Sequence, residues 1–247
     1  MTQQNTGITR SSIQWNHALM CPESHVPIMF PQWQGATSVV MISPEMGAKF
    51  SQHMITLETA TLTPLRAEDQ MFALLLEGEV TVEAGDVTYE VAAHQFFYLP
   101  AHSGWEIKGS GQMLAFFKPY VALSGVKAPG PFCKSLSDVP AEPFLGDEGA
   151  LLQVLFPDDP AFDWGINVFE FAPGGTLPQA ECHFMEHGLY LLQGEGVYRL
   201  GDHWYPVQAG DAIWMAPYVL QWYAATGKTP SKYIYYKEMN RAPISEP

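Results

Sequence analysis

The stretch that organises this chain runs from residue 175 to residue 187 and reads GTLPQAECHFMEH. It places Glu181 two residues before His183, and His187 four residues after that. Pro178 and the flanking glycines argue against a helix, so the sequence predicts an extended strand. Alternate side chains of a strand point to the same face, which would bring the carboxylate and the two imidazoles together.

A carboxylate and two imidazoles on one face form the outline of a metal site. The alternative is a pair of core histidines beside a surface glutamate. We favour the metal site, because burying these three groups without an ion would leave several polar atoms without partners. Cys182 and Glu186 have the opposite parity and are expected to point outward.

The composition predicts a soluble protein built from strands. Of the 247 residues, 47% are hydrophobic and 15% are charged, which is enough apolar material for a substantial core. The 21 glycines and 20 prolines imply many turns and favour an all-β sandwich or barrel over a helical bundle. The formal net charge of -14 and the lack of a basic stripe argue against nucleic acid as a partner.

Targeting and redox signals point to the cytoplasm. Residues 1–16 are polar and lack the apolar core of a signal peptide. The longest apolar runs, such as residues 72–76, are too short to cross a bilayer, so no membrane partner is expected. Three widely spaced cysteines, Cys21, Cys133 and Cys182, suit reduced thiols better than a disulfide framework.

The second half of the sequence repeats the first. LLEGE at 75–79 aligns with LLQGE at 191–195, and FFK at 116–118 aligns with YYK at 235–237. This repetition predicts two copies of one all-β unit. The predicted divisions are an N-terminal barrel over residues 1–120 that includes an irregular arm over residues 1–36, a Pro- and Gly-rich linker over residues 121–149, and a C-terminal barrel over residues 150–247.

The repeat indicates which half carries the metal site. The positions that match the three ligand-type residues in the first half are Leu65, Ala67 and Met71. Since none of these is a good ligand for a hard or borderline metal, we expect the site in the second half only. Gln221, which aligns with Gly104, is a candidate fourth ligand through its amide oxygen, although it could instead bond a loop or a substrate.

The last strand supplies candidates for substrate contacts. Tyr233, Tyr235 and Lys237 share a face by parity. Lys237 could bind a carboxylate or, with a lowered pKa, carry protons. The alignment of Lys118 with Lys237 leaves a purely structural role open.

Comparison of the copies also sorts the remaining tyrosines and histidines. Tyr198 and Tyr233 align with Val82 and Leu114, so they differ between the copies and are functional candidates. Tyr205 aligns with Tyr89 and is expected in the core. The remaining histidines are expected at the surface or in loops: His17, His25, His53, His94, His102 and His203.

Two motifs of the second half resemble those of the cupin superfamily. The usual first motif is G-x5-H-x-H-x3-E-x6-G, and the segment from Gly175 to Gly194 keeps this spacing, with Glu as the first ligand and His as the last. The second motif begins at Gly210 and has Gln221 where cupins carry a histidine. The chain therefore resembles a bicupin, which implies an all-β fold of two tandem jelly-roll barrels.

The resemblance narrows to the (S)-ureidoglycine aminohydrolase family of purine (allantoin) catabolism. It is carried by ECHFMEHG at 181–188, GVYRLGD at 196–202, WYPVQAGD at 204–211, LQWY at 220–223 and YKEMNR at 236–241. It implies one Mn²⁺ per chain held by Glu181, His183, His187 and Gln221. It also implies that Tyr198, Tyr233 and Lys237 contact the substrate.

The implied reaction is metal-dependent hydrolysis of a linear amidine-type C–N bond, from (S)-ureidoglycine to (S)-ureidoglycolate and ammonia. Other functions stay open: an Fe²⁺-dependent cupin dioxygenase, a sensor that binds a small acid, or a storage-type bicupin. A ligand set in only one half weighs against storage. The exposed edges of cupin sheets make a homo-oligomer the expected assembly.

Overall fold

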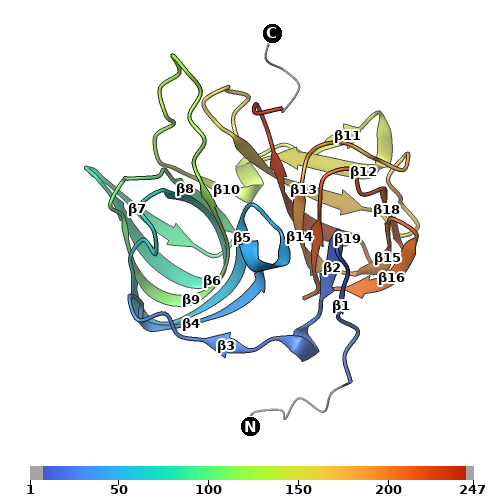
Figure 1. Ribbon diagram of the computed structural model, residues 1–247, viewed down its shortest axis with the longest axis horizontal. Coiled ribbons are helices and arrows are strands. Elements are labelled where there is room, and N and C mark those ends of the chain that lie inside the picture. The colour runs from blue at the N-terminus through green and yellow to red at the C-terminus, as the bar shows by residue number, and fades with distance from the viewer. Residues whose placement is uncertain (1–7, 243–247) are drawn as a thin grey trace.

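The computed structural model of the protein describes residues 8–242. Within this range the regular elements are strands and three short 3₁₀ helices, η1 (Pro22–Ser24), η2 (Pro44–Met46) and η3 (Leu136–Asp138). The all-β prediction is confirmed, and two strand-rich halves lie side by side (Figure 1). Over the same residues, no helix combines the length and the apolar character needed to cross a bilayer.

The first half of the chain contributes a single sheet that curls into a barrel (Figure 1). Its strands are β3 (Pro27–Ile28), β4 (Gln34–Ile42), β5 (Ser51–Leu62), β6 (Asp69–Ala84), β7 (Val87–Ala92), β8 (Gln95–Leu99), β9 (Glu106–Pro119) and β10 (Phe132–Ser135). The long strands β5, β6 and β9 pair along most of their length and form the wall of this first barrel.

The second half combines a large sheet with a small one. Its strands, together with two from the N-terminus, are β1 (Ser12–Ile13), β2 (His17–Met20), β11 (Glu142–Phe144), β12 (Asp147–Val154), β13 (Trp164–Phe171), β14 (His187–Gln193), β15 (Glu195–Leu200), β16 (His203–Gln208), β17 (Ala212–Met215), β18 (Gln221–Ala225) and β19 (Ser231–Glu238). Among the described residues, the large sheet has the order β1-β2-β17-β14-β19-β13-β12-β11 and the small one β16-β15-β18. The two sheets enclose an interior core and form the second barrel.

The sheets of the two barrels include strands from outside the divisions that the sequence predicts at residues 120 and 150. In the described part of the predicted arm, residues 8–36, β2 pairs with β17 of the large sheet and β1 pairs with β2, so this part is not irregular throughout. In the predicted linker, β10 joins the first barrel through β8, and β11 joins the second through β12. The prolines of the arm argue against an α-helix, but the residue before a proline favours extended backbone, which is compatible with short strands.

The apolar run in β6 follows from burial on both faces of the strand. Met71, Ala73 and Leu75 pack in the interior of the first barrel. Phe72 and Leu74 point the other way, into a core that lies between the two barrels. A strand buried on both faces reads as a continuous apolar run rather than an alternating one.

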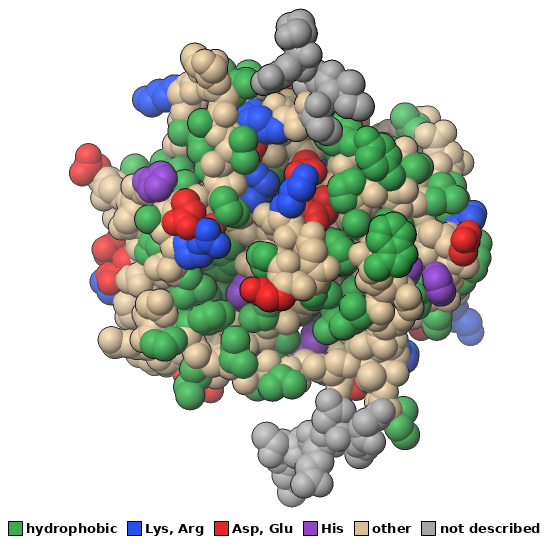
Figure 2. Space-filling model, viewed as in Figure 1, with side chains coloured by type: hydrophobic (Ala, Val, Ile, Leu, Met, Phe, Trp, Pro, Cys, Tyr) green, Lys and Arg blue, Asp and Glu red, His purple; other side chains and the backbone are tan. Residues whose placement is uncertain are grey.

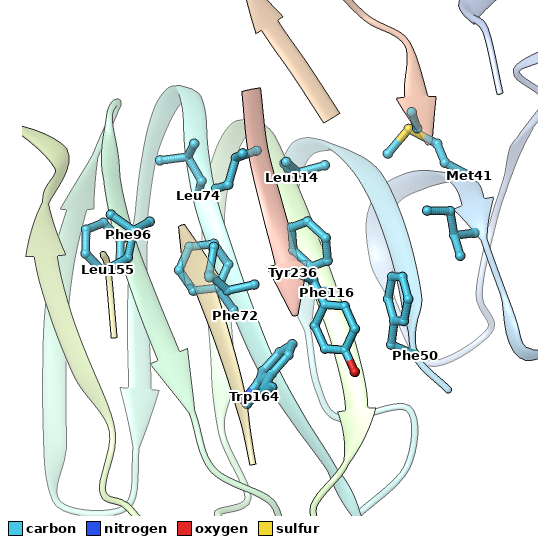
Figure 3. Close-up of a cluster of buried hydrophobic side chains, with 14 of the residues drawn as sticks. Met41, Phe50, Phe72, Leu74, Phe96, Leu114, Phe116, Leu155, Trp164 and Tyr236 are labelled. Carbon is cyan, nitrogen blue, oxygen red and sulfur yellow. The ribbon is translucent and has the colours of Figure 1, made fainter. Parts of the chain in front are cut away.

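This shared core joins the barrels into a single packed unit (Figure 3). Phe50 and Phe116 of the first barrel and Trp164 and Tyr236 of the second are among its members. The Phe50 and Tyr236 rings are stacked with their centroids 4.2 Å apart.

A buried polar network also connects the barrels. Lys118 of β9 forms an ion pair with Asp163, next to β13, and both side chains are shielded from solvent. Asp163 Oδ1 also accepts a hydrogen bond of 2.6 Å from Gln70 Nε2 of β6. Removing one partner of such a pair leaves an uncompensated buried charge, so Lys118 has a structural role.

Two of the histidines expected at the surface are buried instead. His17 is 2% exposed and its Nε2 lies 2.9 Å from the hydroxyl of Tyr205, which is half-buried rather than in the core. His53 is 3% exposed, between two serine side chains. The expectation was wrong for both because each ring has hydrogen-bond partners inside the fold. The spacing of residues along the sequence does not reveal these partners.

Charged side chains of both signs are scattered among apolar and uncharged groups on the face that Figure 2 shows. No extended basic stripe crosses this face.

Candidate metal centre

The segment from Glu181 to Glu186 is a loop rather than the predicted strand. It joins the small sheet through a bridge in which Glu181 and Gln221 exchange backbone hydrogen bonds of 2.8 and 2.9 Å. Regular pairing begins only at His187, the first residue of β14. The strand prediction was wrong in its extent, because Glu181 pairs only as an isolated bridge and residues 182–186 belong to no strand.

Cys182 and Glu186 both point out of the second barrel, as predicted, but only Cys182 reaches solvent. Cys182 is exposed, but Glu186 is 1% exposed and its Oε1 accepts a hydrogen bond of 2.8 Å from Trp214 Nε1. Burial raises the pKa of Glu186 to about 7. Glu186 does point out of the second barrel, but at this place the outside of the second barrel is covered by the first.

The four candidate ligands line one cavity of about 200 Å³ inside the second barrel. The Nε2 atoms of His183 and His187 lie 3.3 Å apart, and Gln221 Nε2 lies 3.1 Å from His183 Nε2. Glu181 Oε2 lies 4.0 Å from the same His183 atom. The bridge between Glu181 and Gln221, rather than strand alternation, brings these side chains together.

The histidines are held in the form that binds metals. His187 Nδ1 donates to the backbone carbonyl of Tyr236 at 3.0 Å, which leaves the lone pair of Nε2 directed at the cavity. Burial, aided by the neighbouring His183, lowers the pKa of His187 to about 3. Burial also lowers the pKa of His183 and raises that of Glu181.

The donor atoms fit a small divalent cation. Metal–ligand distances of about 2.1 Å place neighbouring donors about 3 Å apart, which the contacts of His183 with His187 and Gln221 match. Across residues 8–242, no group of three His, Cys, Asp or Glu side chains is close enough to hold an ion by itself. Here Glu181 must move closer, and a half-turn of the Gln221 amide exchanges its nitrogen for its oxygen.

The three predicted substrate contacts line the same cavity. Lys237 of β19 lies directly across the strand pair from His187. The Tyr198 hydroxyl donates to Gln221 Oε1 at 3.2 Å, and both Tyr198 and Tyr233 are buried. Burial lowers the pKa of Lys237, which the Glu181 carboxylate opposes, and burial raises the pKa of both tyrosines.

The sequence placed Tyr235 on the same face as Tyr233 and Lys237 but assigned it no role, and the structure adds it to the polar groups of the cavity. It lines the cavity between Tyr233 and Lys237, and its hydroxyl accepts a hydrogen bond of 3.0 Å from Asn167 Nδ2. Since Asn167 occupies a lone pair of this oxygen, the Tyr235 proton is left to donate elsewhere. Parity placed Tyr235 on the right face, but Asn167 comes from β13, far away in the sequence.

The strand pairings correct the alignment of the two copies near their ends. Met71 lies opposite Phe117, and its counterpart His187 lies opposite Lys237. Phe117, not Lys118, therefore occupies the place of Lys237. By the same reasoning Met113, not Leu114, matches Tyr233, because these two lie opposite Leu75 and Leu191.

The position of Gln221 is corrected in the same way. Glu83 lies opposite Glu106, and its counterpart Arg199 lies opposite Trp222. The residues that precede these partners, Trp105 and Gln221, are therefore equivalent, and Gly104 is not. The alignment slipped because β9 runs on without a break in the first copy, whereas a loop separates β18 from β19 in the second.

Comparison with known proteins identifies the family of this chain. The model of the cupin domain matches residues 167–236, which contain all four candidate ligands. (S)-Ureidoglycine aminohydrolase from Arabidopsis thaliana is 36% identical over 248 residues, covering 98% of this chain and 82% of that protein. The chain belongs to the (S)-ureidoglycine aminohydrolase family.

One sequence comparison and one structural comparison, both with Escherichia coli proteins, extend the likeness within this family and fold. (S)-Ureidoglycine aminohydrolase from Escherichia coli (strain K12) is 28% identical over 234 residues, covering 92% of this chain and 89% of its own length. The crystal structure of protein Ylba from E. coli superposes with a TM-score of 0.83 at 26% identity, covering 98% of this chain and 99% of that one. The predicted bicupin fold is thereby confirmed.

Proposed function

We propose that this hydrolase converts (S)-ureidoglycine and water to (S)-ureidoglycolate and ammonia, with one Mn²⁺ per chain held by Glu181, His183, His187 and Gln221. The observation that carries the proposal is the convergence of these four donors in a cavity that also holds Lys237. The name of the Arabidopsis relative supplies the substrate.

The donor set suits both the ion and the substrate. One carboxylate, two neutral imidazoles and a neutral amide would leave a divalent cation with a net positive charge, which attracts a carboxylate substrate into an otherwise acidic protein. When bound, the ion would act as a Lewis acid on oxygen or nitrogen atoms of the substrate and on a water molecule.

Lys237 is the group proposed to move a proton. In the reaction the C–N bond to the amine breaks, a C–O bond to the oxygen of water forms, and a proton from that water ends on the leaving nitrogen. The lowered pKa of Lys237 and its place opposite His187 suit Nζ to deliver that proton or to bind the substrate carboxylate.

The tyrosines are proposed to hold the substrate. Their raised pKa keeps both hydroxyl groups protonated, so that each remains a hydrogen-bond donor. Tyr198 lies within hydrogen-bond reach of the Gln221 amide, whose nitrogen would face the Tyr198 oxygen after the half-turn. Tyr233, buried beside Tyr198, is proposed to face the ureido group. A cytoplasmic homo-oligomer remains the expected state of the enzyme.

The test is ammonia release from freshly generated (S)-ureidoglycine, recorded with oxygen uptake. The Mn²⁺-loaded protein should release ammonia above the rate of a protein-free sample, without consuming oxygen, and chelation of the metal should abolish this release. Oxygen uptake would instead favour a dioxygenase. Equal ammonia release before and after chelation would contradict the metal-dependent mechanism.

A further inference from the structure

Glu186 is a buried carboxylate that the proposed chemistry does not use. Its Oε1 accepts from the indole Nε1 of Trp214 at 2.8 Å, and both of its oxygens lie within 3.2 Å of the backbone N of Lys49. Trp214 belongs to β17 of the second barrel, whereas Lys49 precedes β5 of the first. The carboxylate therefore links the end of the loop over residues 181–186, called the metal-binding loop below, to both barrels.

The same short segment of the first barrel holds the residues that follow His187. The ring of Phe50 packs so closely on Gly188 that any side chain at residue 188 would collide with it. Gln52, which is fully buried, donates through Nε2 to the carbonyl of Leu189 at 3.1 Å. Residues 49–52 thus contact residues 186, 188 and 189, on either side of the candidate ligand His187.

We propose that Glu186 is a positioning residue through which the first barrel fixes the metal-binding loop of the second. The inference rests on the proposed metal site. Glu186 and His187 are adjacent and point to opposite sides, so anchoring the carboxylate fixes the backbone from which the imidazole projects. Groups behind the ligands orient them, and their loss typically weakens metal binding by about 10- to 100-fold.

The contacts of the loop explain why this anchor matters. At its start, Glu181 bonds to the backbone of Gln221, and further on the carbonyl of His183 accepts from the Tyr218 N–H at 2.7 Å. Both contacts come from the segment between β17 and the start of β18. At the end of the loop, Glu186 adds contacts from β17 and from the first barrel. The spacing between His183 and His187 is thus set by anchors at both ends.

The test is the dissociation constant of Mn²⁺ from the metal-stripped full chain, measured by equilibrium dialysis at a temperature where every variant is folded. Glu186→Gln keeps the size but places an amide N–H against the Lys49 N–H, and should weaken Mn²⁺ binding by about 10-fold or more. Trp214→Phe removes one donor and keeps the carboxyl group, and should weaken binding by a smaller factor. Lys49→Ala keeps the backbone N–H that Glu186 uses, and should bind as the wild type does.

A second readout separates positioning from general stability. Excess Mn²⁺ should restore the kcat of Glu186→Gln at an unchanged KM, because the ion is held less well but the substrate groups are intact. If Trp214→Phe does not fold, Glu186→Asp replaces it, since the shorter side chain withdraws from both donors.

The outcomes distinguish this inference from the proposed function. If wild-type protein binds no Mn²⁺, the metal site itself is wrong. If it binds Mn²⁺ and Glu186→Gln binds it equally well, only the positioning role is wrong. Weaker binding by Glu186→Gln but not by Trp214→Phe or Glu186→Asp would assign the effect to charge and would also overturn the positioning role.

Discussion

The two barrels share a fold and differ in what fills them. In the second barrel, the interior holds His187, Lys237 and Gln221 around a cavity. At the equivalent places, the first barrel has the apolar side chains of Met71, Phe117 and Trp105, packed in its interior core. The barrel therefore folds with an apolar interior, and the polar set of the second barrel is not needed for folding.

A comparison of one histidine from each barrel shows the same difference. His53 in the first barrel has Ser38 Oγ 2.9 Å from one ring nitrogen and Ser51 Oγ 2.9 Å from the other. His183 in the second has Nε2 near the nitrogens of His187 and Gln221, and within the described residues its Nδ1 has no hydrogen-bond partner. The first ring is satisfied by protein alone, whereas the second is placed for a ligand.

Removing a ligand should give the largest difference between the barrels. Glu181→Ala or His187→Ala should lose bound Mn²⁺ and at least about 1,000-fold in kcat/KM, because the ion's contribution of several kcal/mol to the transition state is lost. Metal content and ammonia release measure this. The matched change in the first barrel, Met71→Ala, should cost about 2–5 kcal/mol of stability and leave the activity of the folded protein unchanged. Full metal content in Glu181→Ala would contradict the assignment.

Substitution of Lys237 should lower activity and spare stability, whereas substitution of Lys118 should do the reverse. Lys237→Met should lower kcat by about 100-fold, the usual scale for a proton-transfer group, while Mn²⁺ binding and thermal stability are retained. Lys118→Met should leave Asp163 unpaired and lower the free energy of unfolding by about 3 kcal/mol, with normal kcat below its melting temperature. Denaturant unfolding and steady-state kinetics of both variants check this. A stable but inactive Lys118→Met would reverse the roles.

Protonation of His53 in the first barrel should lower the stability of the fold at acidic pH, whether or not metal is bound. Burial lowers the pKa of His53 to about 4 from 6.5. The unfolded chain therefore binds more protons below pH 6.5, and stability falls as the pH falls through this window, by about 2 kcal/mol at pH 5. Urea unfolding at pH 7.5 and pH 5 should show a smaller loss for His53→Gln. His94→Gln, at an exposed position, is the control and should behave as wild type.

The smallest effect is expected from Tyr235, to which the sequence assigned a face but no role. Tyr235→Phe removes the hydroxyl that Asn167 orients toward the cavity, and should lower kcat/KM by about 10-fold, the scale of one hydrogen bond. Tyr236→Phe is the matched control, because that hydroxyl belongs to the shared core and its backbone carbonyl remains for His187. Equal kinetics for the two variants would remove Tyr235 from the substrate site.

The sequence alone predicted the fold class, the repeat and the convergence of the candidate ligands. Those predictions rested on local spacing: the ligand motif lies within a single short stretch, and turn residues recur in both copies. Strand parity also placed Tyr233, Tyr235 and Lys237 on one face correctly, because β19 is regular throughout.

The features that the sequence did not predict depend on contacts between distant segments. Glu186 lies outside the second barrel, as parity implies, but the first barrel covers it. His53 is buried with a serine hydroxyl within hydrogen-bond distance of each ring nitrogen, and Lys118 is paired with Asp163, which lies next to β13 of the other barrel. To predict any of these three features, one must know which segments of the chain pack against each other. The periodicity of a single strand does not give this information.

The most direct test of the account is an anomalous difference map at the manganese edge from crystals of the Mn²⁺-loaded protein. We expect one strong peak per chain, bounded by Glu181, His183, His187 and Gln221, and none inside the first barrel. A peak near Met71 in the first barrel, or an empty second barrel in crystals that contain the metal, would contradict it.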